Sequence, residues 1–251
     1  MTEVPRVTII VPTYKEAESL PYLIDRVSKL RLDQNLGIEM LIMDDQSDDG
    51  SADLISLRHE QWVRFIVRSA DHGLSRAVLD GMRRAQSEFL ICMDADLSHP
   101  PEAIPDMISA LNNAADLVVG SRYVDGGSTS EDWGFLRWIN SRVATLLARP
   151  LTDLHDPMSG FFALRRTTFE SGREFDPVGY KIGLEILVKC GCKRVVEIPI
   201  HFENRRFGRS KLTIQQKVLY LRHLFRLYLF KYRTSKPLTR FFLWASSGRS
   251  H

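Results

Sequence analysis

The sequence predicts an α/β fold, with a doubly wound and mainly parallel sheet followed by amphipathic helices near the C-terminus. Two observations predict this class. Short β-branched runs alternate with stretches of helical spacing over roughly the first half of the chain, and such alternation is typical of a parallel sheet covered by helices on both faces. The 251 residues are also enough for one such domain with a sizeable core.

Short apolar runs predict five strands in the first half of the chain. They cover residues 7–11, 40–43, 63–67, 89–93 and 117–119. Apolar side chains at every third or fourth position predict the helices between them. These helices cover residues 16–30, 52–59, 74–86 and 102–112.

The alternation weakens after about residue 123, where a Gly/Ser-rich loop follows. Beyond it we expect an amphipathic stretch at 133–151, a short strand pair near 161–164 and 195–202, and a long helix at about 210–232. We interpret residues 1–233 as one domain, with a nucleotide-binding half at 1–123 and an acceptor-side half at 124–233. Residues 234–251 are expected to form a flexible tail.

The composition is that of an ordinary soluble protein, with 44% apolar residues, 26% charged residues and a net charge of +3. The charges are unevenly placed, because acidic clusters lie in the first half and basic residues crowd the C-terminal end. This distribution indicates a metal-bound substrate and an anionic partner or surface. We expect no nucleic-acid partner, because the chain has no compact basic RNA-binding motif.

The three cysteines have no zinc-ligand or C-x-x-C spacing, which favours reduced thiols in a cytoplasmic protein. The N-terminus lacks the pattern of a signal peptide. The sequence has no uncharged apolar run of about 18 residues, the length that a membrane-spanning helix needs. We therefore expect a chain that does not span a membrane.

Carboxylates gather where three predicted strands end, and Asp94 and Asp96 directly follow the strand at 89–93. The carboxyl ends of parallel strands are where open α/β sheets bind ligands. Like charges so close together need a cation or solvent. The alternative is an exposed, Asp-rich turn. The polar residues at these strand ends are Tyr14, Glu16, Asp44, Asp45, Asp94 and Asp96.

Two hard oxygen ligands suit Mg²⁺ or Mn²⁺ shared with substrate phosphates, and so favour a nucleoside diphosphate. An EF-hand calcium loop beginning at Asp45 is disfavoured, because Ser56 stands where a bidentate Glu is needed. The first strand is not followed by a P-loop or a G-x-G-x-x-G motif. We therefore predict a nucleotide held by strand-end side chains and a metal.

Six segments in order carry a resemblance to a known family: VTIIVPTYKEAESL, IMDDQSDDGS, FLICMDADLSHPPE, VVGSRY, DPMSGFFALRR and ENRRFGRSKL. The series resembles the inverting GT-A glycosyltransferases, and within them the dolichol-phosphate mannosyltransferase and polyprenyl-phosphate glycosyltransferase family. The likeness covers roughly residues 6–233. It implies a Rossmann-like GT-A fold.

The resemblance implies a donor site and a metal site. Asp94 and Asp96 would bind Mg²⁺ or Mn²⁺ with the diphosphate, and Ser98 is a further candidate ligand at a position where many relatives carry Gln. The donor-binding residues would be Pro12, Tyr14, Glu16, Met43, Asp44, Asp45, Asp94, Ala95 and Asp96.

The same resemblance implies that Arg122, Arg137 and Ser141 meet the acceptor phosphate. Arg205 and Lys211 would form the basic pair of a loop that closes over the diphosphate, and with Asp96 they make up the expected catalytic set. The implied reaction is inverting transfer of a hexose, in the first place mannose from GDP-mannose, to a polyprenyl phosphate. Three alternatives stay open: a UDP-glucose donor, a nonlipid acceptor, and a noncatalytic membrane-associated subunit.

Two basic, apolar stretches at 133–149 and 214–228 suggest helices lying in the headgroup plane of a membrane. The alternative is that their apolar residues pack on the core. We expect a peripheral protein on the cytoplasmic face, held by these helices or by a membrane-anchored partner.

Four further residues allow two interpretations each. Asp156 either forms a turn before Pro157 or contacts the sugar. Glu185 either faces the site or lies on a helix surface. His99 and His155 are expected to be structural or solvated rather than catalytic bases.

Overall fold

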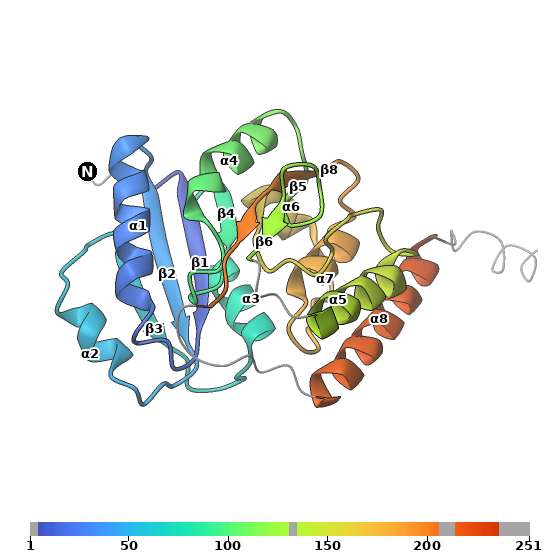
Figure 1. Ribbon diagram of the computed structural model, residues 1–251, viewed down its shortest axis with the longest axis horizontal. Helices are drawn as coiled ribbons and strands as arrows, with labels where there is room; N and C mark the ends of the chain where they lie inside the picture. Colours follow the sequence, from blue (N-terminus) through green and yellow to red (C-terminus); the bar gives the residue numbers. More distant parts are fainter. Residues whose placement is uncertain (1–4, 131–134, 206–213, 236–251) are drawn as a thin grey trace, which may run out of the picture.

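A seven-stranded sheet forms the centre of the protein in the computed structural model, which describes residues 5–130, 135–205 and 214–235 (Figure 1). The strand order is β3-β2-β1-β4-β7-β5-β8, and all neighbours are parallel except where β7 runs antiparallel to β4 and β5. The strands are β1 (Val7–Thr13), β2 (Ile38–Asp44), β3 (Val63–Val67), β4 (Phe89–Cys92), β5 (Leu117–Ser121), β7 (Phe162–Arg165) and β8 (Val195–Pro199).

The predicted pairing of the last two segments is wrong, because β5 lies between β7 and β8. The residues beyond β8 leave the main sheet instead. There β9 (His201–Phe202) pairs with β6 (Ser128–Thr129) in a separate small sheet. Strand partners this far apart in sequence are set by packing, which no local pattern reveals.

Helices cover both faces of the sheet because side chains alternate along each strand. In β1, Val7, Ile9 and Val11 belong to a core that includes residues of α1 and α4, whereas Ile10 belongs to the core on the other face, which includes residues of α3 and α7. The helices are α1 (Leu20–Asp33), α2 (Ser51–Ser56), α3 (Leu74–Arg84), α4 (Ile104–Asn112), α6 (Arg166–Ser171) and α7 (Ile182–Lys189).

Helix α1 begins four residues later than the pattern predicts. Lys15 has a positive φ of 60°, and the chain turns before the helix starts at Leu20, with Pro21 in its first turn. Helix α6 was not predicted, and α7 was anticipated only in the interpretation that placed Glu185 on a helix surface, because six and eight residues give few turns in which helical periodicity can stand out.

Two helices, α5 (Phe135–Ala148) and α8 (Ile214–Ser235), lie side by side at one end of the molecule (Figure 1). The Tyr220 hydroxyl donates to the Ala144 carbonyl at 2.7 Å, and Lys217 Nζ donates to Asn140. The two helices share a small core with α7 that includes Leu184, Leu224 and Leu227. Among the described residues, no helix is both long and apolar enough to cross a membrane.

Candidate active site

The edge formed by the carboxyl ends of β1, β2 and β4 gathers most of the expected donor residues. Strand β4 ends at Cys92, and the chain then turns through Leu97, whose φ is 66°, before a 3₁₀ turn begins at Pro101. Asp94 and Asp96 therefore lie outside the pleat. In a continuing strand, residues 94 and 96 would point to the same face with parallel side chains. Because the chain turns here instead, both carboxylates can approach one ligand.

Asp96 is buried and held from two sides. Its Oδ1 accepts hydrogen bonds from the Ser98 amide at 3.1 Å and the Ser98 hydroxyl at 2.5 Å. Its Oδ2 pairs with Arg205 Nε at 2.6 Å. The Ser98 hydroxyl thus orients Asp96, and Arg205 brings a positive charge beside the carboxylate from a distant part of the chain.

Asp94 is more open than Asp96, with 28% of its side chain exposed. Its backbone N–H donates to His99 Nδ1 at 3.0 Å, which places the proton of a neutral His99 on Nε2. Burial and the nearby Asp96 raise the pKa of the Asp94 carboxyl, although His99 opposes the shift. A cation bound here would remove the repulsion between the two carboxylates.

His99 is structural, one of the two roles expected for it. Its ring is buried, stacks on Phe161 with centroids 5.3 Å apart, and meets Phe202 edge-on. Burial lowers the pKa of His99, so the imidazole stays neutral at pH 7. Gly160 lies beside both Asp94 and His99, since a Cβ there would lie 3.4 Å from Asp94 Oδ1 and 3.5 Å from His99 Cε1.

Asp44 and Asp45, at the end of β2, both hold loops of this edge. Asp44 accepts hydrogen bonds from the amide and hydroxyl of Ser47. Asp45 forms an ion pair with Arg68 and accepts from the Gly73 amide at 2.6 Å. The two carboxylates therefore shape the edge through the loops after β2 and β3.

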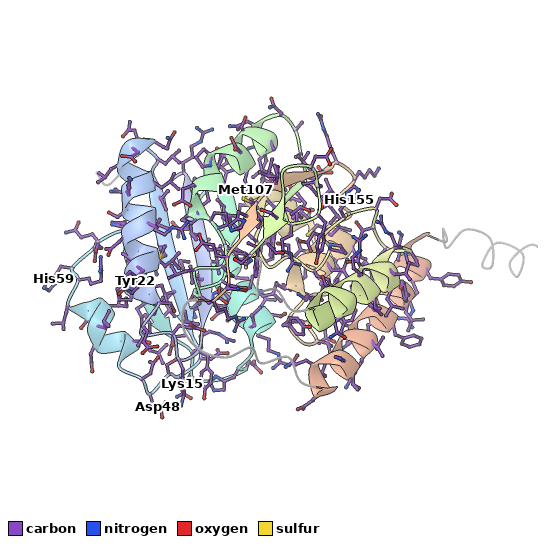
Figure 2. The ribbon with its side chains drawn as sticks, viewed as in Figure 1. Lys15, Tyr22, Asp48, His59, Met107 and His155 are labelled. Atoms are coloured by element: carbon purple, nitrogen blue, oxygen red, sulfur yellow. The ribbon has the colours of Figure 1, made fainter. Side chains whose placement is uncertain are left out.

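The loop after β1 lies against the loop after β2. The Lys15 amide donates to the Ser47 hydroxyl, and Lys15 Nζ lies 2.7 Å from Asp48. Figure 2 shows Lys15 and Asp48 near each other at the lower edge of the molecule. Tyr14 is 45% exposed beside them, and the Glu16 carboxylate accepts from the Ser19 hydroxyl.

Three expected donor residues have side chains buried in the sheet and its packing. They could contact a ligand only through backbone atoms or by limiting the shape of the site. These residues are Pro12, Met43 and Ala95.

Arg122, which was expected to meet the acceptor phosphate, is bound to Asp156. Its Nε and one terminal nitrogen each lie 2.7 Å from an oxygen of the fully buried Asp156 carboxylate. Asp156 is therefore the buried partner of an arginine. Its position is fixed in turn by Glu197, which accepts hydrogen bonds from the amides of Asp156 and His155.

Lys181 is a residue of this region that the sequence did not single out. Its Nζ donates to the Met158 carbonyl, in the same segment as Asp156. Burial and the neighbouring Arg122 lower the pKa of Lys181 to about 8, against the opposing charges of Asp156 and Asp94. No sequence pattern marks such a lysine, because it lies about 90 residues from Asp94 in the chain.

Glu185 fits neither interpretation that the sequence allowed. It is fully buried, pairs with Lys189 at 2.7 Å, accepts from the Asp176 amide and lies 3.3 Å from His223 on α8. Its contacts join α7 to α8. Two expected site groups, the Lys211 residue and the Arg137 side chain, lie outside the part of the chain that the structure describes.

A family model for glycosyl transferase family 2 matches residues 8–173, the region that contains this edge. The chain belongs to glycosyl transferase family 2. It is a glycosyltransferase enzyme, as the motif series predicted.

Relatives of this family 2 chain extend beyond the matched region. The dolichol-phosphate mannosyltransferase of Mycosarcoma maydis is 41% identical over 92% of this chain and 81% of its own length. The dolichol-phosphate mannosyltransferase of Saccharomyces cerevisiae is 37% identical over 95% of this chain and 92% of its own length. The polyprenol monophosphomannose synthase of Mycolicibacterium smegmatis is 35% identical over 83% and 81%.

Solved structures agree on the fold of this family 2 enzyme. Glucosyl-3-phosphoglycerate synthase from Mycobacterium tuberculosis, in complex with Mn²⁺ and UDP, superposes with a TM-score of 0.66 over 90% of this chain and 80% of its own. At 17% identity the likeness concerns the fold alone. The GT-A fold expected from the sequence is confirmed.

Proposed function

We propose that this enzyme transfers mannose from GDP-mannose to a dolichyl-type polyprenyl phosphate, with inversion at the anomeric carbon. The observation that carries the proposal is similarity over nearly the whole chain to proteins named dolichol-phosphate mannosyltransferase. The paired carboxylates Asp94 and Asp96 with Arg205 beside them support it, because they suit a nucleoside diphosphate and its metal ion.

Asp94 and Asp96 fit a bound Mg²⁺ or Mn²⁺, since both offer hard oxygen atoms at one edge and repel each other without a cation. In the described part of the chain, no group of three or more His, Cys, Asp or Glu side chains is arranged to hold a metal. Further ligands would come from the diphosphate and water, as such ions prefer. The ion would neutralise charge on the departing diphosphate.

Arg205 stabilises the same departing charge. Its guanidinium lies beside Asp96 in the structure, so a modest side-chain movement would bring it to a diphosphate at this edge. Lys211 is proposed as its basic partner on the strength of the family motif.

The acceptor needs little help to become a nucleophile. A phosphate monoester has its second pKa near 6, so its oxygen is anionic at neutral pH. No general base is therefore needed to deprotonate it. This agrees with the structural role of His99, which is buried and accepts a hydrogen bond from the Asp94 amide. The protein's task is to align that oxygen behind the anomeric carbon, and one in-line displacement then gives a β-linked product from an α-linked donor.

The helix pair α5/α8 supports a location at a membrane surface. One face of α8 packs inward through Tyr220, Leu224 and Leu227, and the opposite face exposes apolar residues. The inner face thus packs on the core, and the membrane contact is proposed for the exposed face alone. The exposed apolar residues are Val143, Leu146 and Leu147 of α5, and Val218, Leu221, Phe225 and Leu229 of α8.

Basic side chains border the exposed apolar face, a pattern that suits anionic lipid headgroups. We propose a peripheral location on the cytoplasmic face, where the three free thiols would stay reduced. The exposed basic residues of the two helices include Arg142, Lys217, Arg222 and Arg233.

The test is transfer of labelled sugar into an organic-extractable product. GDP-mannose and UDP-glucose are supplied separately, each with and without polyprenyl phosphate and with Mg²⁺ or Mn²⁺. We expect extractable label from GDP-mannose only when the lipid phosphate is present. Lipid-dependent transfer from UDP-glucose alone would overturn the donor, and transfer without lipid would overturn the acceptor.

A further inference from the structure

Tyr123 connects the end of β5 to helix α5. Its hydroxyl donates a hydrogen bond to Ser141 Oγ at 2.9 Å, across 18 residues of sequence. The residue is only partly exposed. The family resemblance implies that Ser141 meets the acceptor phosphate, so this bond bears directly on how that hydroxyl is presented.

Two arginines hold the Tyr123 ring. The guanidinium carbons of Arg122 and Arg142 lie 5.2 Å and 5.6 Å from the ring centroid, within the range of cation–π attraction. Arg122 is itself fixed by two bonds to the buried Asp156. The ring therefore rests on an anchored group, and its O–H has a defined direction toward Ser141.

We propose that Tyr123 is a positioning residue of the acceptor site, which presents the Ser141 hydroxyl and the Arg142 guanidinium to a phosphate monoester. The inference rests on the proposed function. Because Tyr123 donates to Ser141 Oγ, the hydroxyl hydrogen of Ser141 is directed to another acceptor. An anionic phosphate oxygen is a strong acceptor for that hydrogen, and the charge of Arg142, next in the helix, would reinforce the contact.

The substitution Tyr123→Phe removes the hydroxyl and keeps the ring that both arginines approach. We expect kcat/KM for polyprenyl phosphate to fall about fivefold, through KM for the acceptor, while KM for the sugar nucleotide is unchanged. Ser141→Ala should lower it at least as much. The double variant should be no worse than Ser141→Ala alone, because the Tyr123 hydroxyl acts through Ser141.

Tyr220→Phe is the matched control. Tyr220 also donates its hydroxyl to α5, but to the Ala144 carbonyl at 2.7 Å. This variant should lower Tm and leave KM for the acceptor unchanged. A rise in acceptor KM equal to that of Tyr123→Phe would mean that Tyr123 merely supports α5. Multiplying losses in the double variant of Tyr123 and Ser141 would likewise overturn the proposal.

Direct binding separates this inference from the proposed function. Calorimetric titration with farnesyl phosphate, inorganic phosphate and farnesol should give about fivefold weaker binding of farnesyl phosphate to Tyr123→Phe than to the wild type, and unchanged binding of farnesol. Inorganic phosphate should bind the wild type more weakly than farnesyl phosphate does.

These titrations distinguish the role of Tyr123 from the proposed function. A wild type that binds farnesyl phosphate but transfers no mannose contradicts the proposed function alone. Equal affinity of wild type and Tyr123→Phe for farnesyl phosphate, or no binding by either, overturns the role of Tyr123. Equal affinity of the wild type for inorganic and farnesyl phosphate overturns the assignment of the cluster to a lipid acceptor.

Discussion

Asp96 shows how one residue combines a structural and a functional demand. Its carboxylate is buried against Ser98 and Arg205, yet it lies at the edge where a donor diphosphate would bind. Asp96→Asn keeps the volume and removes the negative charge that a metal ion needs. We expect kcat/KM to fall by about 10³ or more, in the range seen when a group that stabilises transition-state charge is lost.

Folding of the Asp96→Asn variant is checked by circular dichroism and Tm. A control substitution, Asp53→Asn on α2, alters an exposed carboxylate away from the site and should leave activity unchanged. Full activity of Asp96→Asn would contradict the assignment of Asp96 to the metal.

Lys181 predicts a pH dependence. Its lowered pKa of about 8 means that the ammonium is charged at pH 7 and loses its proton as the pH rises through 8. We expect kcat/KM for the donor to fall across that interval, because a positive charge beside Asp94 and Asp156 would be lost. The measurement is a kcat/KM profile from pH 6.5 to 9.5, which reports groups of the free enzyme.

Lys181→Arg should move the alkaline limb of the profile upward, and Lys181→Met should give a low, flat profile. An unchanged limb in Lys181→Arg would assign it to another group. The sign for stability is opposite to that for activity. Between pH 8 and the ordinary pKa of 10.5, the unfolded state binds the proton that the folded state has lost, so this residue's contribution to stability rises with pH.

Among the secondary-structure elements, helix α8 has two apolar faces, one buried and one exposed to solvent. The inner face is buried against α5 and α7, and the outer face leaves Phe225 62% exposed and Leu221 52% exposed. We expect Phe225→Glu to weaken binding to vesicles of anionic phospholipid in co-sedimentation by about thirtyfold, since inserting a Phe side chain is worth roughly 2 kcal/mol.

Leu57→Glu is the matched control, because Leu57 is 75% exposed at the end of α2, outside the helix pair. Its vesicle binding should equal that of the wild type. Equal vesicle binding by Phe225→Glu and the wild type would remove α8 from the membrane contact.

The strands of the first half were predictable because each is a short and mainly apolar run, although β3 carries Arg64 and is only partly buried. Strand β4 reads FLIC and is buried throughout. The order of the strands beyond β4 was not predictable. The antiparallel β7 enters between β4 and β5, and it is placed there by side-chain packing rather than by its own four residues.

For the whole molecule, the separation of acidic and basic side chains implies dependence on a divalent ion. Removal of metal by EDTA should abolish transfer, and Mg²⁺ or Mn²⁺ should restore it, because Asp94 and the diphosphate would otherwise repel each other. We also expect GDP to raise Tm when the metal is present and not after its removal. Metal-independent transfer would contradict the role of the two carboxylates.

The sequence by itself determined the α/β class, the strand-end carboxylates and the family, because these depend on local periodicity and on motifs that are contiguous in the chain. Only the tertiary structure decided that Arg122 is held by Asp156, that Glu185 is buried between α7 and α8, and that Lys181 lies near Asp156 and Asp94. The physical reason is that a charged side chain takes its role from the partner that compensates its burial, and that partner is brought near only by folding.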